Sequence, residues 1–172
     1  ARSRSSSMLT MRALLNALGV KDISEAIHGQ AGLEALRERK IDLVLTDLAM
    51  SPMDGLELTR HLRNDEKSPN PFVPIIMITG HTEKYRVEAA RDAGVTEFLA
   101  KPITAHNLFA RITEILERPR AFVRCDSYFG PDRRRLRSGL AGARDPVHDR
   151  PVVAEGPHRL RLLLLLAELG HR

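Results

Sequence analysis

Cysteine and aromatic side chains are scarce in this sequence. Cys125 carries the single thiol, Trp is absent, and aromatic residues make up 4% of the 172 positions. One cysteine excludes an internal disulfide framework and favours a reducing compartment, so we expect the protein to be cytoplasmic. Aliphatic residues must therefore form the core, and a hydrophobic fraction of 42% is enough for one ordinary domain.

Long hydrophobic runs are missing as well. The longest uninterrupted apolar stretch, Leu162 to Ala167, is far shorter than a membrane span. The opening segment ARSRSSS is not followed by the apolar region of a signal peptide. We therefore expect no membrane partner.

Basic residues are unevenly distributed along the chain. Residues 1–117 carry 15 Lys and Arg against 16 Asp and Glu, whereas residues 118–172 carry 12 Arg against 6 acidic residues. We predict a folded domain at 1–117, with residues 1–7 atypical, and a largely disordered, Arg-rich extension at 118–172.

Two other roles for the extension stay open. An Arg-rich tail can bind nucleic acid, but few aromatics and no groove-reading element accompany these arginines, so we do not expect a nucleic-acid partner. The stretch Leu160 to Leu169 could form an amphipathic helix that docks onto a partner or onto the core.

The spacing of apolar residues predicts strands and helices in alternation. In chain order these are a helix at 8–18, a strand at 23–27, a helix at 30–39, a strand at 41–45, a helix at 56–62, a strand at 73–78, a helix at 83–93, a strand at 97–100, and a helix capped by Thr104 that runs to 117. This order predicts an α/β fold with a doubly wound parallel sheet and right-handed crossovers.

Three polar residues follow the ends of three predicted strands. They are Asp47, Thr79 and Lys101. Ligands of an open parallel sheet bind at the carboxyl ends of its strands, so these side chains should converge. A carboxylate can attack phosphorus, and phosphoryl transfer needs a cation and hydroxyl or amide donors around the transferred group. The triplet therefore indicates phosphoryl transfer to Asp47.

The same stretches resemble the receiver domains of bacterial response regulators, in particular chemotaxis receivers. The resemblance is carried by IDLVLTDLAMSPMDGLEL around Asp47, VPIIMITGH around Thr79 and EFLAKPIT around Lys101, and covers about residues 8–117. It implies a flavodoxin-like sheet with strand order 2-1-3-4-5. It also implies a two-component phosphorelay in which a histidine kinase or phosphotransfer protein forms an aspartyl phosphate, and a signalling domain rather than an enzyme, with at most self-catalysed phosphorylation and dephosphorylation.

Residue roles follow from this resemblance. Asp47 matches the phosphoacceptor, Lys101 the phosphoryl-contacting lysine, and Thr79 the switch hydroxyl. Phe98 matches the aromatic residue whose rotamer follows the switch, although a strand phenylalanine can equally be ordinary core. Mg²⁺ is the implied cofactor, with Asp47 and the backbone carbonyl of Ala49 among its ligands. Pro102 matches a proline that usually follows a cis bond.

The N-terminus departs from the family pattern. Ser6 and Ser7 stand where two adjacent acidic residues belong, and the preceding residues cannot form an apolar central strand. We expect the first strand to be degenerate or absent and Mg²⁺ affinity to be weak, because hydroxyls replace carboxylates poorly around a hard cation. The alternative function is a pseudo-receiver, a binding module with impaired phosphorylation. Out-of-frame translation could also explain both unusual ends.

Overall fold

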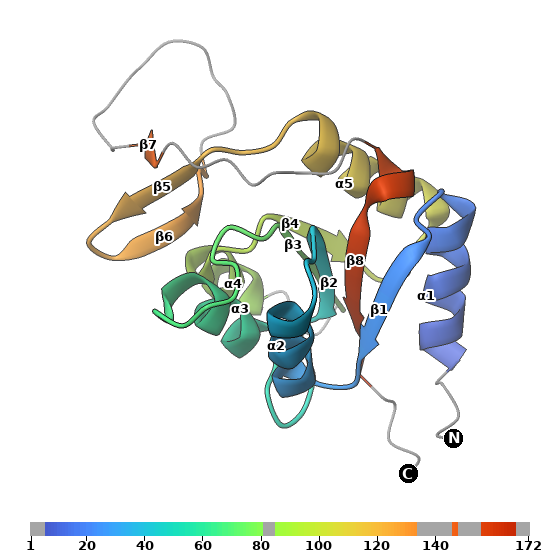
Figure 1. The fold of residues 1–172 in the computed structure, drawn as a ribbon, viewed down its shortest axis with the longest axis horizontal. Coiled ribbons are helices and arrows are strands. Elements are labelled where there is room, and N and C mark those ends of the chain that lie inside the picture. The colour runs from blue at the N-terminus through green and yellow to red at the C-terminus, as the bar shows by residue number, and fades with distance from the viewer. Residues whose placement is uncertain (1–5, 81–84, 134–145, 148–155, 168–172) are drawn as a thin grey trace.

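The computed structural model describes residues 6–80, 85–133, 146–147 and 156–167. A five-stranded parallel sheet lies at the centre, with helices on both faces (Figure 1). Its strands are β1 (Asp22–Ala26), β2 (Leu43–Asp47), β3 (Ile75–Thr79), β4 (Glu97–Ala100) and β8 (Arg161–Leu165). The helices are α1 (Ser6–Ala17), α2 (Gly29–Glu38), α3 (Gly55–Asn64), α4 (Val87–Ala93) and α5 (Ala105–Glu117). The predicted doubly wound α/β class is confirmed.

Strand β8, from the C-terminal part of the sequence, occupies an interior place in the sheet. The strand order is β1-β8-β2-β3-β4, so β8 pairs in parallel with β1 on one side and β2 on the other. This is the 2-1-3-4-5 order of the predicted fold, with β8 in the place of strand 1. Ser6 and Ser7 belong to the first turn of α1, where both are exposed.

The possible helix at 160–169 is not found in the described part of this stretch. Residues 161–165 are a strand, and residues 168–169 lie outside the described residues. A strand with helices over both faces needs apolar side chains at every position, which a run of leucines supplies. The leucines alternate between the two sides of the sheet, with Leu160, Leu162, Leu164 and Leu166 in one core layer and Leu163 and Leu165 in the other.

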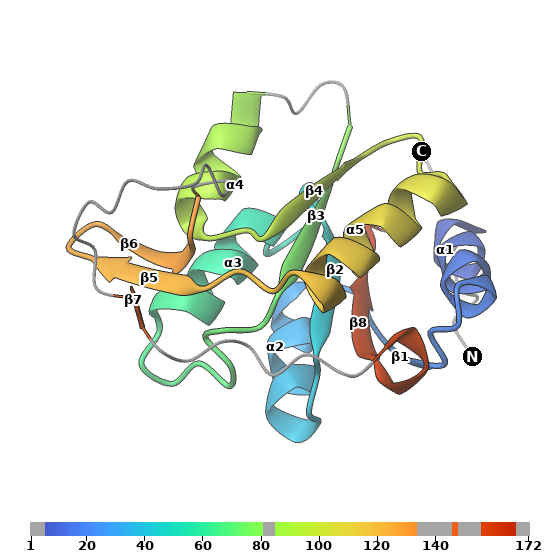
Figure 2. The ribbon, with the colours of Figure 1, turned by 90° about the horizontal axis from the view of Figure 1, so that it is seen from above.

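Each face of the sheet has its own helical layer (Figure 2). Helices α1 and α5 cover one face, where Met8, Met11, Leu15, Leu108, Ile112 and Ile115 pack against the sheet. Helices α2, α3 and α4 cover the other, through Leu33, Leu36, Leu56, Leu58, Leu62, Ala90 and Ala93. The predicted helix at 83–93 begins later, at Val87, and residues 81–84 lie outside the described residues.

An ion pair between Arg161 and Asp42 fixes the register of β8. The Arg161 Nε and Nη2 atoms donate to the two carboxylate oxygens of Asp42, at 2.9 and 3.2 Å, and the Arg161 backbone N–H donates to Asp42 Oδ2 at 2.9 Å. Asp42 is buried at the start of β2, whose neighbour β8 begins at Arg161. The hydrogen bond to Asp42 raises the pKa of Arg161, so this cation stays charged.

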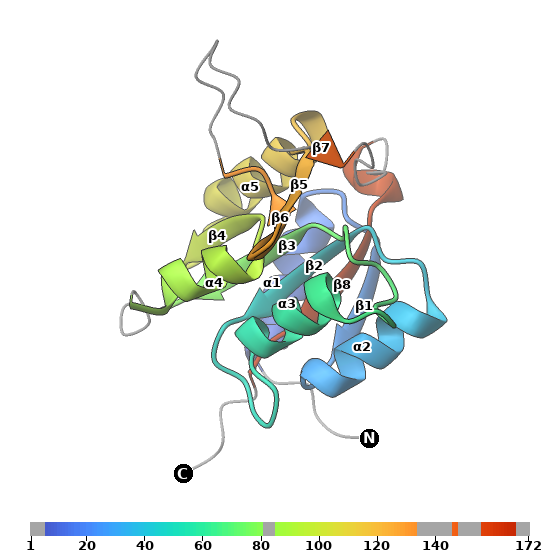
Figure 3. The same cartoon turned by 90° about the vertical axis from the view of Figure 1, so that its left-hand side faces the viewer.

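Part of the C-terminal extension folds onto the domain. Strands β5 (Phe122–Cys125) and β6 (Tyr128–Pro131) form an antiparallel hairpin beside α3 and α4, and β7 (Pro146–Val147) pairs with β5 (Figure 3). A 3₁₀ turn, η2 (Pro157–Arg159), precedes β8. The expectation of a largely disordered tail therefore does not hold for these segments, whereas residues 134–145, 148–155 and 168–172 lie outside the described residues. The domain boundary at residue 117 stays a prediction.

An aromatic cluster explains why the hairpin folds. The rings of Phe72, Phe122 and Phe129 pack with centroids 5.2 to 5.6 Å apart. The buried Arg63 lies 5.0 Å from the centroid of the Phe122 ring and donates to the carbonyls of Pro71, Val73 and Gly94. Burial lowers the pKa of Arg63 to about 9, which leaves it protonated at neutral pH.

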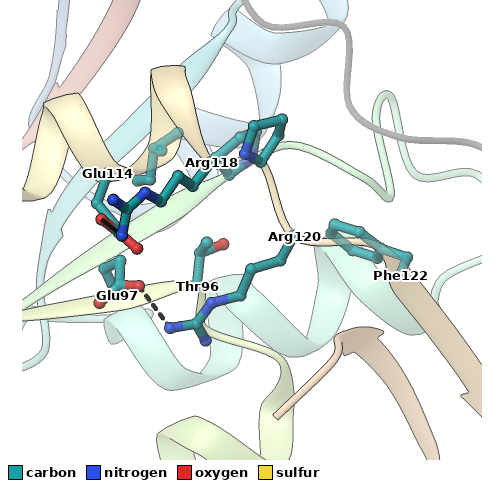
Figure 4. A pocket seen from close by; sticks show the side chains of 9 residues that line it. Thr96, Glu97, Glu114, Arg118, Arg120 and Phe122 are labelled. Carbon is teal, nitrogen blue, oxygen red and sulfur yellow. Dashed lines mark hydrogen bonds and ion pairs between the residues drawn. The ribbon is translucent and has the colours of Figure 1, made fainter. Parts of the chain in front are cut away.

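A second contact joins the extension to the sheet. Arg120 donates to the buried Glu97 of β4 at 2.6 Å, beside a hollow of about 10 Å³ (Figure 4). Such a space is close to the room needed by one water molecule. The hollow is therefore a small packing gap between α5, β4 and the extension, and not a ligand site.

Candidate phosphoacceptor site

The three residues predicted to converge do so at one edge of the sheet. Asp47 ends β2 and Thr79 ends β3, and both are buried, with 5% and 8% exposure. Lys101 follows β4 directly, and its Nζ lies 3.3 Å from Asp47 Oδ1. Backbone pairing keeps them together, because the Lys101 N–H donates to the Thr79 carbonyl at 2.9 Å and Ile78 pairs with Asp47.

The loop after Asp47 is held by the start of α3. Asp54 caps this helix by accepting from the Glu57 N–H at 2.8 Å, while the Glu57 side chain accepts from the Asp54 N–H at 3.3 Å. Asp54 also pairs with Arg86 of the segment before α4. Gly55 comes next, and a side chain there would collide with the backbone oxygen of Asp47. The Met-Asp-Gly sequence thus brings a helix start against the phosphoacceptor position.

The other residues implied by the family resemblance lie around this edge. Phe98 is half-buried in β4 and packs against the core layer under α2, α3 and α4. Ala49 is exposed in the loop that follows Asp47. The peptide bond between Lys101 and Pro102 is cis. The switch role of Phe98 and the metal-ligand role of Ala49 remain predictions.

One member of the site has no counterpart among the predicted residues. The backbone N–H of Ala167, two residues beyond β8, donates to Asp47 Oδ2 at 2.8 Å. The two carboxylate oxygens of Asp47 therefore face different groups, Lys101 at Oδ1 and Ala167 at Oδ2. A backbone donor leaves no side-chain signature, so the sequence could indicate it only through the run of leucines that ends at this position.

Among the described residues, the donors around Asp47 do not fit Mg²⁺. No group of three or more His, Cys, Asp or Glu side chains is placed to hold a metal ion in the part of the chain that the structure describes. Ser6 and Ser7 lie in α1 and not at the site. A hydrogen-bond donor, the Ala167 N–H, faces the second Asp47 oxygen, whereas a hard dication needs further oxygen ligands there.

The chain belongs to the response-regulator receiver family. Residues 4–113 match the family described as the response regulator receiver domain, which is more than half of the chain. Receiver domains are signalling modules of two-component systems, and the fold and the grouping of Asp47, Thr79 and Lys101 agree with that family.

Curated relatives and solved structures agree with this assignment. Chemotaxis protein CheY-3 of Vibrio cholerae is 34% identical over 105 residues, which are 61% of this chain and 79% of that protein. CheY of Pseudomonas aeruginosa is 34% identical over 105 residues, or 83% of its length. The receiver domain of the sensor histidine kinase PA1611 from P. aeruginosa, solved with magnesium in its active-site cleft, has a TM-score of 0.53 at 27% identity and covers 62% of this chain and 84% of that one. A receiver domain protein from Clostridium thermocellum has a TM-score of 0.57 at 27% identity, covering 66% and 89%.

No helix in the described part of the chain is long and apolar enough to cross a membrane.

Proposed function

We propose that this chain is the phosphoacceptor receiver of a two-component phosphorelay and that Asp47 takes the phosphoryl group. The observation that supports this most strongly is the ion pair between Lys101 Nζ and Asp47 Oδ1 at 3.3 Å, at the carboxyl edge of the sheet with Thr79 on the adjacent strand. A histidine kinase or a phosphotransfer protein would be the donor.

The transfer is a substitution at phosphorus. A carboxylate oxygen of Asp47 attacks the phosphorus of a phosphoimidazole, the new O–P bond forms as the P–N bond breaks, and the imidazole leaves with the bonding electron pair and takes up a proton. Lys101 offsets the charge of the transferred oxygens. The Thr79 hydroxyl donates a hydrogen bond to one of them.

The output of this receiver would be protein–protein contact. The aspartyl phosphate adds charge next to Thr79 and draws its hydroxyl inward, and Phe98 follows on the neighbouring strand. The surface of α4, β4 and α5 would then shift between two states that a downstream protein distinguishes. We infer a cytoplasmic protein that acts without membrane or nucleic-acid partners.

Intact mass spectrometry tests the proposal. The chain is incubated with phosphoramidate, an N–P donor, in parallel with Mg²⁺ and with a chelator. We expect one phosphoryl adduct that is absent in Asp47→Asn and retained in Asp65→Asn, a variant of an exposed carboxylate. Since the described residues offer Mg²⁺ no cluster of carboxylates, the adduct should form at similar rates in both arms. An adduct that persists in Asp47→Asn would contradict the assignment.

A pseudo-receiver is the second candidate function. It is favoured by the Ala167 N–H that faces Asp47 Oδ2 and by the lack of a carboxylate cluster among the described residues. This candidate predicts no adduct in either arm, even from a phosphorylated histidine kinase, with the fold intact by circular dichroism.

A further inference from the structure

We propose that the C-terminal segment is a positioning element of the phosphoacceptor site, in which the Ala167 N–H orients the Asp47 carboxylate. It holds Oδ2 and directs Oδ1 toward Lys101. The effect of this positioning on phosphoryl transfer rests on the proposed function. The positioning itself can be measured without phosphoryl transfer.

The first support is that the two carboxylate oxygens of Asp47 contact different groups. Ala167 N lies 2.8 Å from Oδ2, and Lys101 Nζ lies 3.3 Å from Oδ1. A carboxylate restrained at one oxygen by a backbone amide cannot rotate freely about its terminal torsion, which is otherwise broad. The oxygen on the lysine side is therefore the one presented to an incoming phosphoryl group.

The second support is the way in which Ala167 is held in place. At the start of β8, Arg161 pairs with Asp42. The five residues between Arg161 and Ala167 are all buried leucines, namely Leu162, Leu163, Leu164, Leu165 and Leu166. A slip of one residue would exchange the two core layers to which the leucines belong. The register fixed at Arg161 thus determines which amide reaches Asp47.

The third support is the place of β8 in the sheet. It lies between β1 and β2, the strand that carries Asp47. The edge of the site next to Asp47 is therefore built by a segment 120 residues later in the sequence. Docking of β8 and the orientation of Asp47 are coupled.

Removal of one N–H tests the positioning role. Ala167→Pro deletes the donor, whereas Ala167→Gly keeps it. The probe is the ¹³C resonance of the Asp47 side-chain carboxyl at a fixed neutral pH. We expect its chemical shift to change in Ala167→Pro and to stay as in the unsubstituted chain in Ala167→Gly, since only the first variant removes the donor to Oδ2.

A second variant tests the same role in case Ala167→Pro does not fold. A chain made by semisynthesis with a backbone ester in place of the Ala167 amide keeps the side chain and adds no charge but lacks the donor, and its Asp47 resonance should show the same change. An unchanged Asp47 resonance in a folded Ala167→Pro or ester chain overturns the positioning role.

Phosphorylation is the separate readout. With phosphoramidate, the adduct should form about tenfold more slowly in Ala167→Pro than in Ala167→Gly if a disordered carboxylate loses a favourable orientation. Equal rates of adduct formation in the two variants would show that the orientation of Asp47 does not speed phosphoryl transfer. A changed Asp47 resonance in Ala167→Pro together with no adduct in the unsubstituted chain refutes the proposed function but supports the positioning by Ala167.

Discussion

At the scale of single residues, the site depends on a close approach between α3 and β2. Gly55 places the first turn of α3 against the backbone oxygen of Asp47, and its own N–H donates to the Leu48 carbonyl at 2.9 Å. There is no room for even a methyl group at this position. The glycine of the Met-Asp-Gly motif is thus explained by space, since its backbone is not in the left-handed region.

Gly55→Ala should therefore destabilise the domain although alanine favours helices. The added methyl forces α3 away from β2, and we expect a loss of about 1–3 kcal/mol in the free energy of unfolding. Urea denaturation followed by circular dichroism measures this. The control, Gln30→Ala at an exposed position of α2, should change the free energy by less than about 0.5 kcal/mol. Equal midpoints for the two variants would show that α3 can move without cost.

At the scale of elements, β8 is the segment on which the sheet depends. It pairs with both neighbours, and its leucines belong to both core layers. The anchor at its start, between Arg161 and Asp42, involves a buried carboxylate that accepts from a backbone amide as well as from the guanidinium.

Two carboxylates at the same end of the sheet, on either side of Arg161, allow a comparison of a buried and an exposed ion pair. Asp42→Ala removes the acceptor of the Arg161 backbone N–H and should cost about 1–3 kcal/mol. Asp22→Ala removes the carboxylate of an exposed pair with Arg39, at 3.4 Å, and should cost less than about 0.5 kcal/mol. Urea denaturation of both variants measures the difference. Similar losses would mean that Asp42 does not anchor β8.

At the scale of the whole molecule, the core is closed by a segment far away in the sequence. Removal of one large buried aliphatic side chain costs about 2–5 kcal/mol, and a typical domain is stable by about 5–15 kcal/mol. The four buried leucines of β8 together are therefore comparable to that whole margin.

A chain that ends at residue 156 should therefore lose cooperative unfolding. Thermal melting followed by circular dichroism should show a broad transition in place of a sigmoidal one, and a dye that binds apolar surface should fluoresce. A chain that ends at Ala167 is the control and should melt cooperatively. A sharp transition in the shorter chain would mean that the sheet is stable without β8.

The sequence predicted the site better than the sheet, for physical reasons. Asp47, Thr79 and Lys101 each follow a short local run of strand residues, so their common edge could be derived from the alternation of elements. The place of β8 could not be derived, because a run of leucines has no period and its partner Asp42 is 119 residues away. The hairpin was missed because Phe122 and Phe129 pack on Phe72, which lies far from them in the sequence.

The position of β8 has a consequence for synthesis on the ribosome. Strands β1 and β2 emerge early, with the apolar slot between them empty, and the strand that fills it is made after every other element of the sheet. The domain cannot complete its core until β8 has been made, and closure of a loop of this length slows folding. During that interval the nascent chain exposes two strand edges, so it should depend on chaperones more than a receiver whose central strand is made first.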